Sequence, residues 1–133
     1  MLRQGTSAVV TTLCCLMAAS ALAADLTKDS LETVKKNIAD KKAVLVDVRE
    51  KAEWDAGHIE GAIFLPLSQL QADKSPDAWK KQLPEGVIIY THCVIGKRSV
   101  TAGNILAKHR DDIRPLKAGY RELVQAGFKP AAK

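Results

Sequence analysis

Two short, continuously apolar stretches set the fold class that the sequence predicts. Residues 43–47 (AVLVD) and 87–91 (VIIYT) are rich in β-branched side chains and do not alternate between apolar and polar positions. This pattern is typical of strands that are buried on both faces, which occur in parallel sheets covered by helices. We therefore expect an α/β protein with a parallel sheet at its centre.

Segments with helical character lie between the predicted strands. Asp29 and Ser30 can cap a helix whose inward stripe is Leu31, Val34 and Ile38. Strands that alternate with helices indicate a parallel sheet with helices on both faces. The remaining expected elements are short strands at 62–67 and 113–116 and helices at 51–57, 68–73, 75–83, 98–110 and 120–126.

The first 23 residues have the features of a secretory signal peptide. Arg3 is the only charged residue before Asp25, and the mostly apolar residues 8–19 are too few to span a bilayer, which takes about 20 residues. Ala21-Leu22-Ala23 has the small-x-small pattern that signal peptidase cleaves. We expect cleavage after Ala23 and export to a bacterial periplasm, with no stable membrane insertion of the mature chain. An uncleaved membrane anchor is the alternative.

Cleavage would leave one domain at 24–133, with its core at about 29–129. It would remove Cys14 and Cys15, so that Cys93 would be the one cysteine of the mature chain. A lone cysteine cannot form an internal disulfide. It is a reactive thiol, a partner for another molecule, or a small buried core residue.

The charge pattern does not favour nucleic-acid binding. Lys and Arg number 20 against 15 Asp and Glu, which gives a net charge of +5, but the cations are scattered along the chain in pairs. Aromatic residues make up only 5% of the sequence, too few for a platform on which bases stack. We interpret the lysine pairs as solvated surface and expect no nucleic-acid partner.

Cys93 lies where a parallel α/β fold places its ligands. It follows the strand predicted at 87–91 and precedes a helix, and ligands of parallel sheets bind beyond the carboxyl ends of the strands. We expect the segment from Cys93 through Val94, Ile95, Gly96, Lys97 and Arg98 to curl as a strand-to-helix loop. Its backbone N–H groups and the helix N-terminus favour an anion.

Such a loop is predicted to activate the thiol. Lys97 and Arg98 add positive charge close to the N–H groups, so the pKa of Cys93 should fall below its free value of about 8.5. We expect Arg98 to face the thiol and Lys97 to be more exposed. A thiolate is the stronger nucleophile and a sulfur carrier. Three scattered histidines and one cysteine do not form a zinc site, so no metal is expected.

Three motifs of this sequence resemble those of rhodanese domains. They are VDVRE with EW and GHIEGA at 46–62, YTHC with Gly96 and Arg98-Ser99 at 90–99, and AGY through AGF at 118–128. The resemblance implies a three-layer sandwich and a sulfurtransferase whose Cys93 takes sulfane sulfur as a persulfide. It implies a small sulfur-containing donor, a thiol or cyanide acceptor, a protein as a further candidate acceptor, and no cofactor. Val94 and Ile95 stand where thiosulfate-specific members carry basic residues, so the resemblance does not identify the donor.

The sequence is also compatible with two other functions. A Cys phosphatase or arsenate reductase is less favoured, because those enzymes have a longer loop between the Cys and the Arg than residues 94–97 provide. A sulfur-carrier or redox-sensing module without turnover is the other alternative, and the apolar Val94 and Ile95 could then dock a protein.

Five further residues are candidates for a role at the site. Asp47 and Arg49 follow a buried strand and are expected to support the loop as an ion pair, as the family resemblance also implies. Glu53 is expected to tether a loop, and His58 to make a fixed hydrogen bond in a turn. His92 precedes the nucleophile, but adjacent strand residues point to opposite faces, so it is poorly placed as a base.

Overall fold

The computed structural model describes residues 24–72 and 75–133, so the signal peptide predicted at 1–23 lies outside the described residues. At its centre is a parallel sheet with the strand order β2-β1-β3-β4. The strands are β1 (Ala43–Asp47), β2 (Ile63–Phe64), β3 (Ile88–His92) and β4 (Ile113–Pro115).

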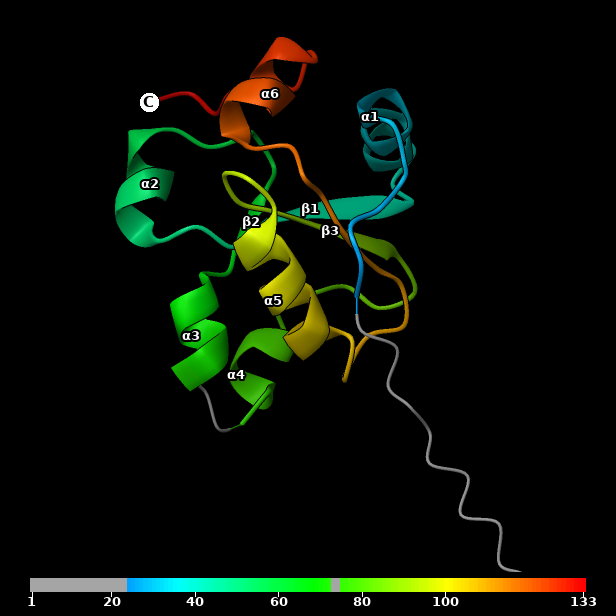
Figure 1. The fold of residues 1–133 in the computed structure, drawn as a ribbon, viewed down its shortest axis with the longest axis vertical. Helices are drawn as coiled ribbons and strands as arrows, with labels where there is room; N and C mark the ends of the chain where they lie inside the picture. The colour runs from blue at the N-terminus through cyan, green and yellow to red at the C-terminus, as the bar shows by residue number, and fades with distance from the viewer. Residues whose placement is uncertain (1–23, 73–74) are drawn as a thin grey trace, which may run out of the picture.

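Helices cover both faces of this sheet, as Figure 1 shows: α1 and α6 lie on one side, and α3, α4 and α5 lie on the other. The α/β class with a parallel sheet between two helical layers is therefore confirmed. The helices are α1 (Leu31–Ala39), α2 (Lys51–Ala56), α3 (Leu67–Ala72), α4 (Asp77–Lys80), α5 (Lys97–Leu106) and α6 (Tyr120–Gln125).

Each face of the sheet has its own apolar core. Leu45 packs in the cluster that includes Val34 of α1 and Leu123 of α6. Its neighbour Val46 packs in the cluster that includes Leu106 of α5. Successive residues of β1 thus point to opposite faces, and both are buried because each face is covered.

Two predicted helices are shorter than the sequence indicates. The expected helix at 75–83 is only α4, and the one at 98–110 ends as α5 at Leu106. The Arg110 guanidinium, which lies beyond α5, donates hydrogen bonds to the carbonyl oxygens of Lys80 (3.0 Å) and Leu83 (3.1 Å). These side-chain bonds satisfy carbonyl oxygens at and just after the end of α4, where Pro84 has no N–H to donate.

The register of β1 and β3 positions the site. Asp47 pairs with His92 across the sheet, so both strands end at the same level. Residues that follow β1 and residues that follow β3 are therefore neighbours, as the sequence predicted for the carboxyl edge. Within residues 24–72 and 75–133, no helix combines the length and the hydrophobicity that a membrane span needs.

Candidate active site

Cys93 begins a short loop that connects β3 to α5. The residue exposes only 1% of its surface and contacts the core on the α5 side of the sheet. Gly96 ends the loop as the residue that caps α5, with a φ of +100° that only glycine adopts without strain. The loop can therefore turn sharply and begin α5 at Lys97.

Backbone N–H groups surround the thiol. The amide of Gly96 donates a hydrogen bond to Cys93 Sγ at 3.2 Å. Burial raises the pKa of Cys93, but N–H groups of Ser99, Gly96, Ile95 and Val94 lower it more, so the pKa lies below its ordinary value. The loop thus favours the thiolate, which is the reactive form of cysteine.

Contacts from outside the loop fix its shape. Gly119, the residue before α6, packs so closely that a Cβ added there would lie 2.4 Å from the carbonyl oxygen of Val94. On the other side, Ser99 Oγ lies 2.7 Å from the carbonyl oxygen of Gly96 and 2.8 Å from that of Leu116. Beyond their places in the motifs at 90–99 and 118–128, the sequence alone predicts no role for Gly119 or Ser99. The polar Ser99 on the buried face of a helix was a signal that could have identified it.

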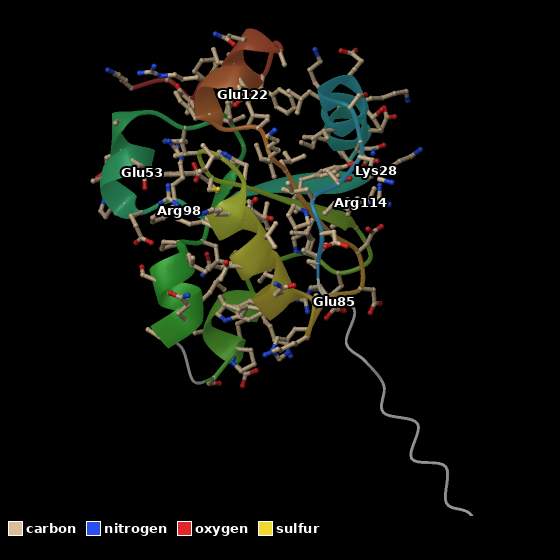
Figure 2. All side chains as sticks on the ribbon, viewed as in Figure 1. Lys28, Glu53, Glu85, Arg98, Arg114 and Glu122 are labelled. Atoms are coloured by element: carbon tan, nitrogen blue, oxygen red, sulfur yellow. The ribbon has the colours of Figure 1, made fainter. Side chains whose placement is uncertain are left out.

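The two cations of the loop differ in their surroundings. Arg98 donates two hydrogen bonds to the Glu53 carboxylate, from Nη1 to Oε1 at 2.6 Å and from Nη2 to Oε2 at 2.9 Å. Figure 2 shows the two labelled residues next to each other, Glu53 on α2 and Arg98 at the start of α5. This pairing lowers the pKa of Glu53 to about 2. Lys97 is exposed to solvent.

Asp47 and Arg49 form a buried ion pair, with Arg49 Nη2 2.7 Å from Asp47 Oδ2. The same nitrogen donates a hydrogen bond to the carbonyl oxygen of Gly57 at 2.7 Å, and the guanidinium lies 5.2 Å from the centre of the Tyr120 ring. Arg49 thereby links the end of β1 to the α2 and α6 regions. This is the arrangement expected of a supporting pair.

His92 is fully buried beside this pair. Its Nε2 lies 3.5 Å from Asp47 Oδ2, and neither ring nitrogen has a hydrogen-bond partner among the described residues. Burial lowers the pKa of His92, and the imidazole is therefore neutral at physiological pH. His58 Nδ1 donates a hydrogen bond to the Trp54 carbonyl oxygen at 3.0 Å, consistent with a fixed position in its turn.

An open pocket of about 330 Å³ adjoins the loop. Val94 and Ile95, which line it, are 49% and 67% exposed, so two adjacent apolar residues face solvent beside the loop. Among the described residues, no group of three or more His, Cys, Asp and Glu could hold a metal ion. The pocket is lined by Arg49, Val94, Ile95, Gly119, Tyr120, Arg121 and Glu122.

The model of the rhodanese-like domain family matches residues 30–126. The chain belongs to the rhodanese-like family. The resemblance seen in the three motifs is thus confirmed. This rhodanese-like chain is 37% identical over 83 residues to the Bacillus subtilis protein YqhL, which is named as uncharacterized. That match covers 62% of this chain and 61% of YqhL, less than two thirds of the relative's length.

Solved structures of rhodanese-like proteins have the same fold. The human single-domain sulfurtransferase TSTD1 is 28% identical, with a TM-score of 0.61 over 73% of this chain and 94% of its own. A rhodanese-related protein of Thermoplasma volcanium is 24% identical, with a TM-score of 0.62 over 77% of this chain and 95% of its own. At this identity the similarity is one of fold alone.

Proposed function

We propose that this rhodanese-like protein is a sulfurtransferase in which Cys93 carries sulfur as a persulfide. The main support is the thiol itself, which is held at the end of β3 among backbone N–H groups that lower its pKa. The similarity to human TSTD1, a protein named as a sulfurtransferase, supports the same reaction class.

The proposed reaction consists of two displacements at sulfur. The Cys93 thiolate attacks the outer sulfur of the donor, a new S–S bond forms, and the donor's own bond to that sulfur breaks. The electron pair of the broken bond leaves with the rest of the donor. A thiolate or cyanide then attacks the outer sulfur of the persulfide and releases the Cys93 thiolate.

The loop suits both states of the cysteine. A persulfide carries its negative charge one atom further out than a thiolate, and the ring of N–H groups provides several donors for that charge. The first displacement needs a sulfur donor and the second needs an acceptor. Cys93 supplies the nucleophile, and the N–H groups of its loop stabilise the charge on sulfur. Asp47 and Arg49 act here as supporting residues that hold the end of β1 against the loop.

A single-turnover experiment tests the proposal. The protein is incubated with thiosulfate and, separately, with a polysulfide and with mercaptopyruvate, and its intact mass is then measured. We expect a gain of one sulfur with at least one donor and its loss after cyanide is added. Cys93→Ser should show neither change while it keeps the circular dichroism spectrum of the parent. A Ser variant that still transfers sulfur would refute the assignment of Cys93.

Sulfur carriage to a protein partner is a second candidate. The exposed Val94 and Ile95 beside a buried thiol favour it, because apolar side chains around a reactive group provide a contact surface for another molecule. A carrier would load sulfur once and release it to a protein thiol, but would show no steady-state turnover with cyanide.

We also propose that the protein is exported to the periplasm. This proposal rests on the signal-like sequence at 1–23.

A further inference from the structure

One edge of β1 is only partly covered by its neighbour β2. β2 pairs with Val46 and Asp47, the last two residues of β1, whereas β3 runs alongside the whole strand. Residues 43–45 therefore have an open edge on the β2 side. This edge lies at the amino end of β1, whereas Cys93 follows the carboxyl end of β3, so the proposed reaction does not use it.

Backbone groups on this edge are left without partners. Successive residues of a parallel strand direct their N–H and C=O groups to opposite neighbours. The Asp47 carbonyl oxygen accepts a hydrogen bond from the Leu65 amide on the β2 side, so Ala43 and Leu45, an even number of positions earlier, face the same side. Among the residues that the structure describes, neither the Leu45 N–H nor the Ala43 C=O has a hydrogen-bond partner. Both residues are buried, and a buried backbone group without a partner costs free energy, so a ligand that pairs with these groups is stabilised.

A groove of about 260 Å³ runs along the open edge. We call it the β1-edge groove; its walls come from α1, from residues 43–45, from residues 59–61 and from residues 127–129. The open edge of three residues spans about 10 Å, so it can pair with an extended segment of similar length. Apolar walls beside free backbone groups are the features of a site where a peptide adds a strand to a sheet. The apolar residues of the walls include Ile38, Ile59 and Phe128.

The charges along the β1-edge groove favour a carboxylate. Its lining includes Lys35, Lys129 and one acid, Glu60. Lys129 Nζ lies 3.5 Å from the Glu60 carboxylate, which compensates its charge. Lys35 Nζ donates a hydrogen bond to the Ala126 carbonyl oxygen at 3.0 Å, and its acidic neighbour Glu32, at 3.4 Å, is 82% exposed. An ion pair with so exposed a partner is weak, so the charge of Lys35 is available to an anion in the groove.

We propose that the β1-edge groove binds the carboxyl-terminal segment of a partner protein as an added strand. A carbonyl oxygen of the segment accepts from the Leu45 N–H, and one of its amides donates to the Ala43 C=O. An apolar side chain of the segment contacts Phe128, and the terminal carboxylate pairs with Lys35. Because the groove and Cys93 lie at opposite ends of the strands, the partner can bind while the thiol stays free to react.

The experiment titrates short peptides into the isotope-labelled protein and follows the backbone amides by NMR. The first probe is acetyl-Gly-Ala-Val-Val with a free terminal carboxylate. We expect the amide signals of Ala43 and Leu45 to shift, and hydrogen exchange of the Leu45 amide to slow. The same peptide with an amidated terminus should bind about fivefold more weakly, because it has no charge for Lys35. A peptide with every backbone nitrogen methylated should not bind, since it cannot donate to the Ala43 C=O.

Neighbouring lysines of α1 provide a matched pair of variants. Lys35→Gln should bind the free-carboxylate peptide as weakly as the parent binds the amidated one. Lys36→Gln should bind like the parent, because Lys36 does not line the groove and pairs with Asp40 at 2.7 Å. Circular dichroism of both variants checks that the fold is kept.

Three results would overturn the proposal. The first is an unchanged Leu45 amide at saturating peptide concentration, and the second is equal affinity for the free and the amidated peptide. The third is binding of octanoate but of neither peptide, which would assign the β1-edge groove to a small apolar acid. Sulfur loading of Cys93 depends on none of these results, so the sulfurtransferase proposal stands or falls separately.

Discussion

The Glu53 carboxylate accepts two hydrogen bonds from the Arg98 guanidinium and so joins α2 to the first turn of α5. Forty-five positions of sequence separate the two residues, and about a third of each side chain is accessible to solvent. The pair sits beside the Cys93 loop, where the charge of Arg98 acts on the thiol and the charge of Glu53 opposes it. The pair therefore couples α2 to the chemistry of the loop.

The two members of this pair should shift the Cys93 pKa in opposite directions. Glu53 and, to a smaller extent, the Cys93 thiolate raise the pKa of Arg98, so Arg98 must in turn favour the thiolate. Arg98→Ala should raise the pKa of Cys93, and Glu53→Gln should lower it, both modestly because the pair is partly solvated. The rate of iodoacetamide alkylation against pH measures both shifts.

Lys97→Ala is the control for that measurement. Its exposed charge should change the alkylation pKa less than Arg98→Ala does, and the change should disappear at high salt. If Arg98→Ala leaves the alkylation pKa unchanged, the backbone N–H groups activate the thiol alone.

The same pair predicts a loss of stability in acid. Arg98 lowers the pKa of Glu53 from 4.5 to about 2 in the folded state. The stabilisation is therefore complete above pH 4.5, where the unfolded chain is also ionised, and is lost as the pH falls toward 2. After allowance for solvent, we expect about 1 kcal/mol from this source. Urea unfolding at pH 6 and pH 3 should show a smaller pH effect for Glu53→Gln than for the parent, and equal effects would contradict the assignment.

Gly119→Ala should damage the active loop. The new methyl would overlap the Val94 carbonyl oxygen, which has no flexible atoms with which to yield. We expect a loss of about 1–3 kcal/mol in unfolding free energy together with slower sulfur loading of Cys93. Gly86→Ala is the control, because Gly86 has a φ of +72° in open space before β3. It should cost roughly 1 kcal/mol through strain and leave sulfur loading unchanged.

The mature chain is predicted to begin at Ala24. In the structure the Ala24 amide donates a hydrogen bond to Asn104 Oδ1 at 2.6 Å, and the Thr27 amide donates one to the Pro115 carbonyl oxygen at 2.7 Å. A chain that starts at Ala24 would keep both contacts. Intact-mass measurement of protein from a periplasmic extract decides the point, and a mass that includes residues 1–23 would show that cleavage does not occur.

The sequence predicted the elements that are determined by residues close together in the chain. The apolar run at 43–47 is β1 without any change of bounds, and the Ser30 side chain accepts a hydrogen bond from the Thr33 amide as a helix cap. The position of Cys93 after β3 also followed from the chain alone. Each of these depends on residues a few positions apart, which a sequence pattern displays directly.

Features that depend on the folded arrangement could not be predicted in this way. Neither the choice of Glu53 as the partner of Arg98 nor the contact of Gly119 with Val94 has a signal in local spacing. The hydrogen bond from Arg110 to the Leu83 carbonyl oxygen likewise joins residues that are 27 positions apart. Only the sheet order brings such residues together.

The close approach of Gly119 to the Val94 carbonyl has a consequence for how this protein can diversify. The loop is held by main-chain contacts and by Ser99, and the thiol is activated by main-chain N–H groups. The side chains at positions 94 and 95 take part in neither task. Substitutions at positions 94 and 95 can therefore change which molecules the protein contacts, while the reactivity of the Cys93 thiol stays the same.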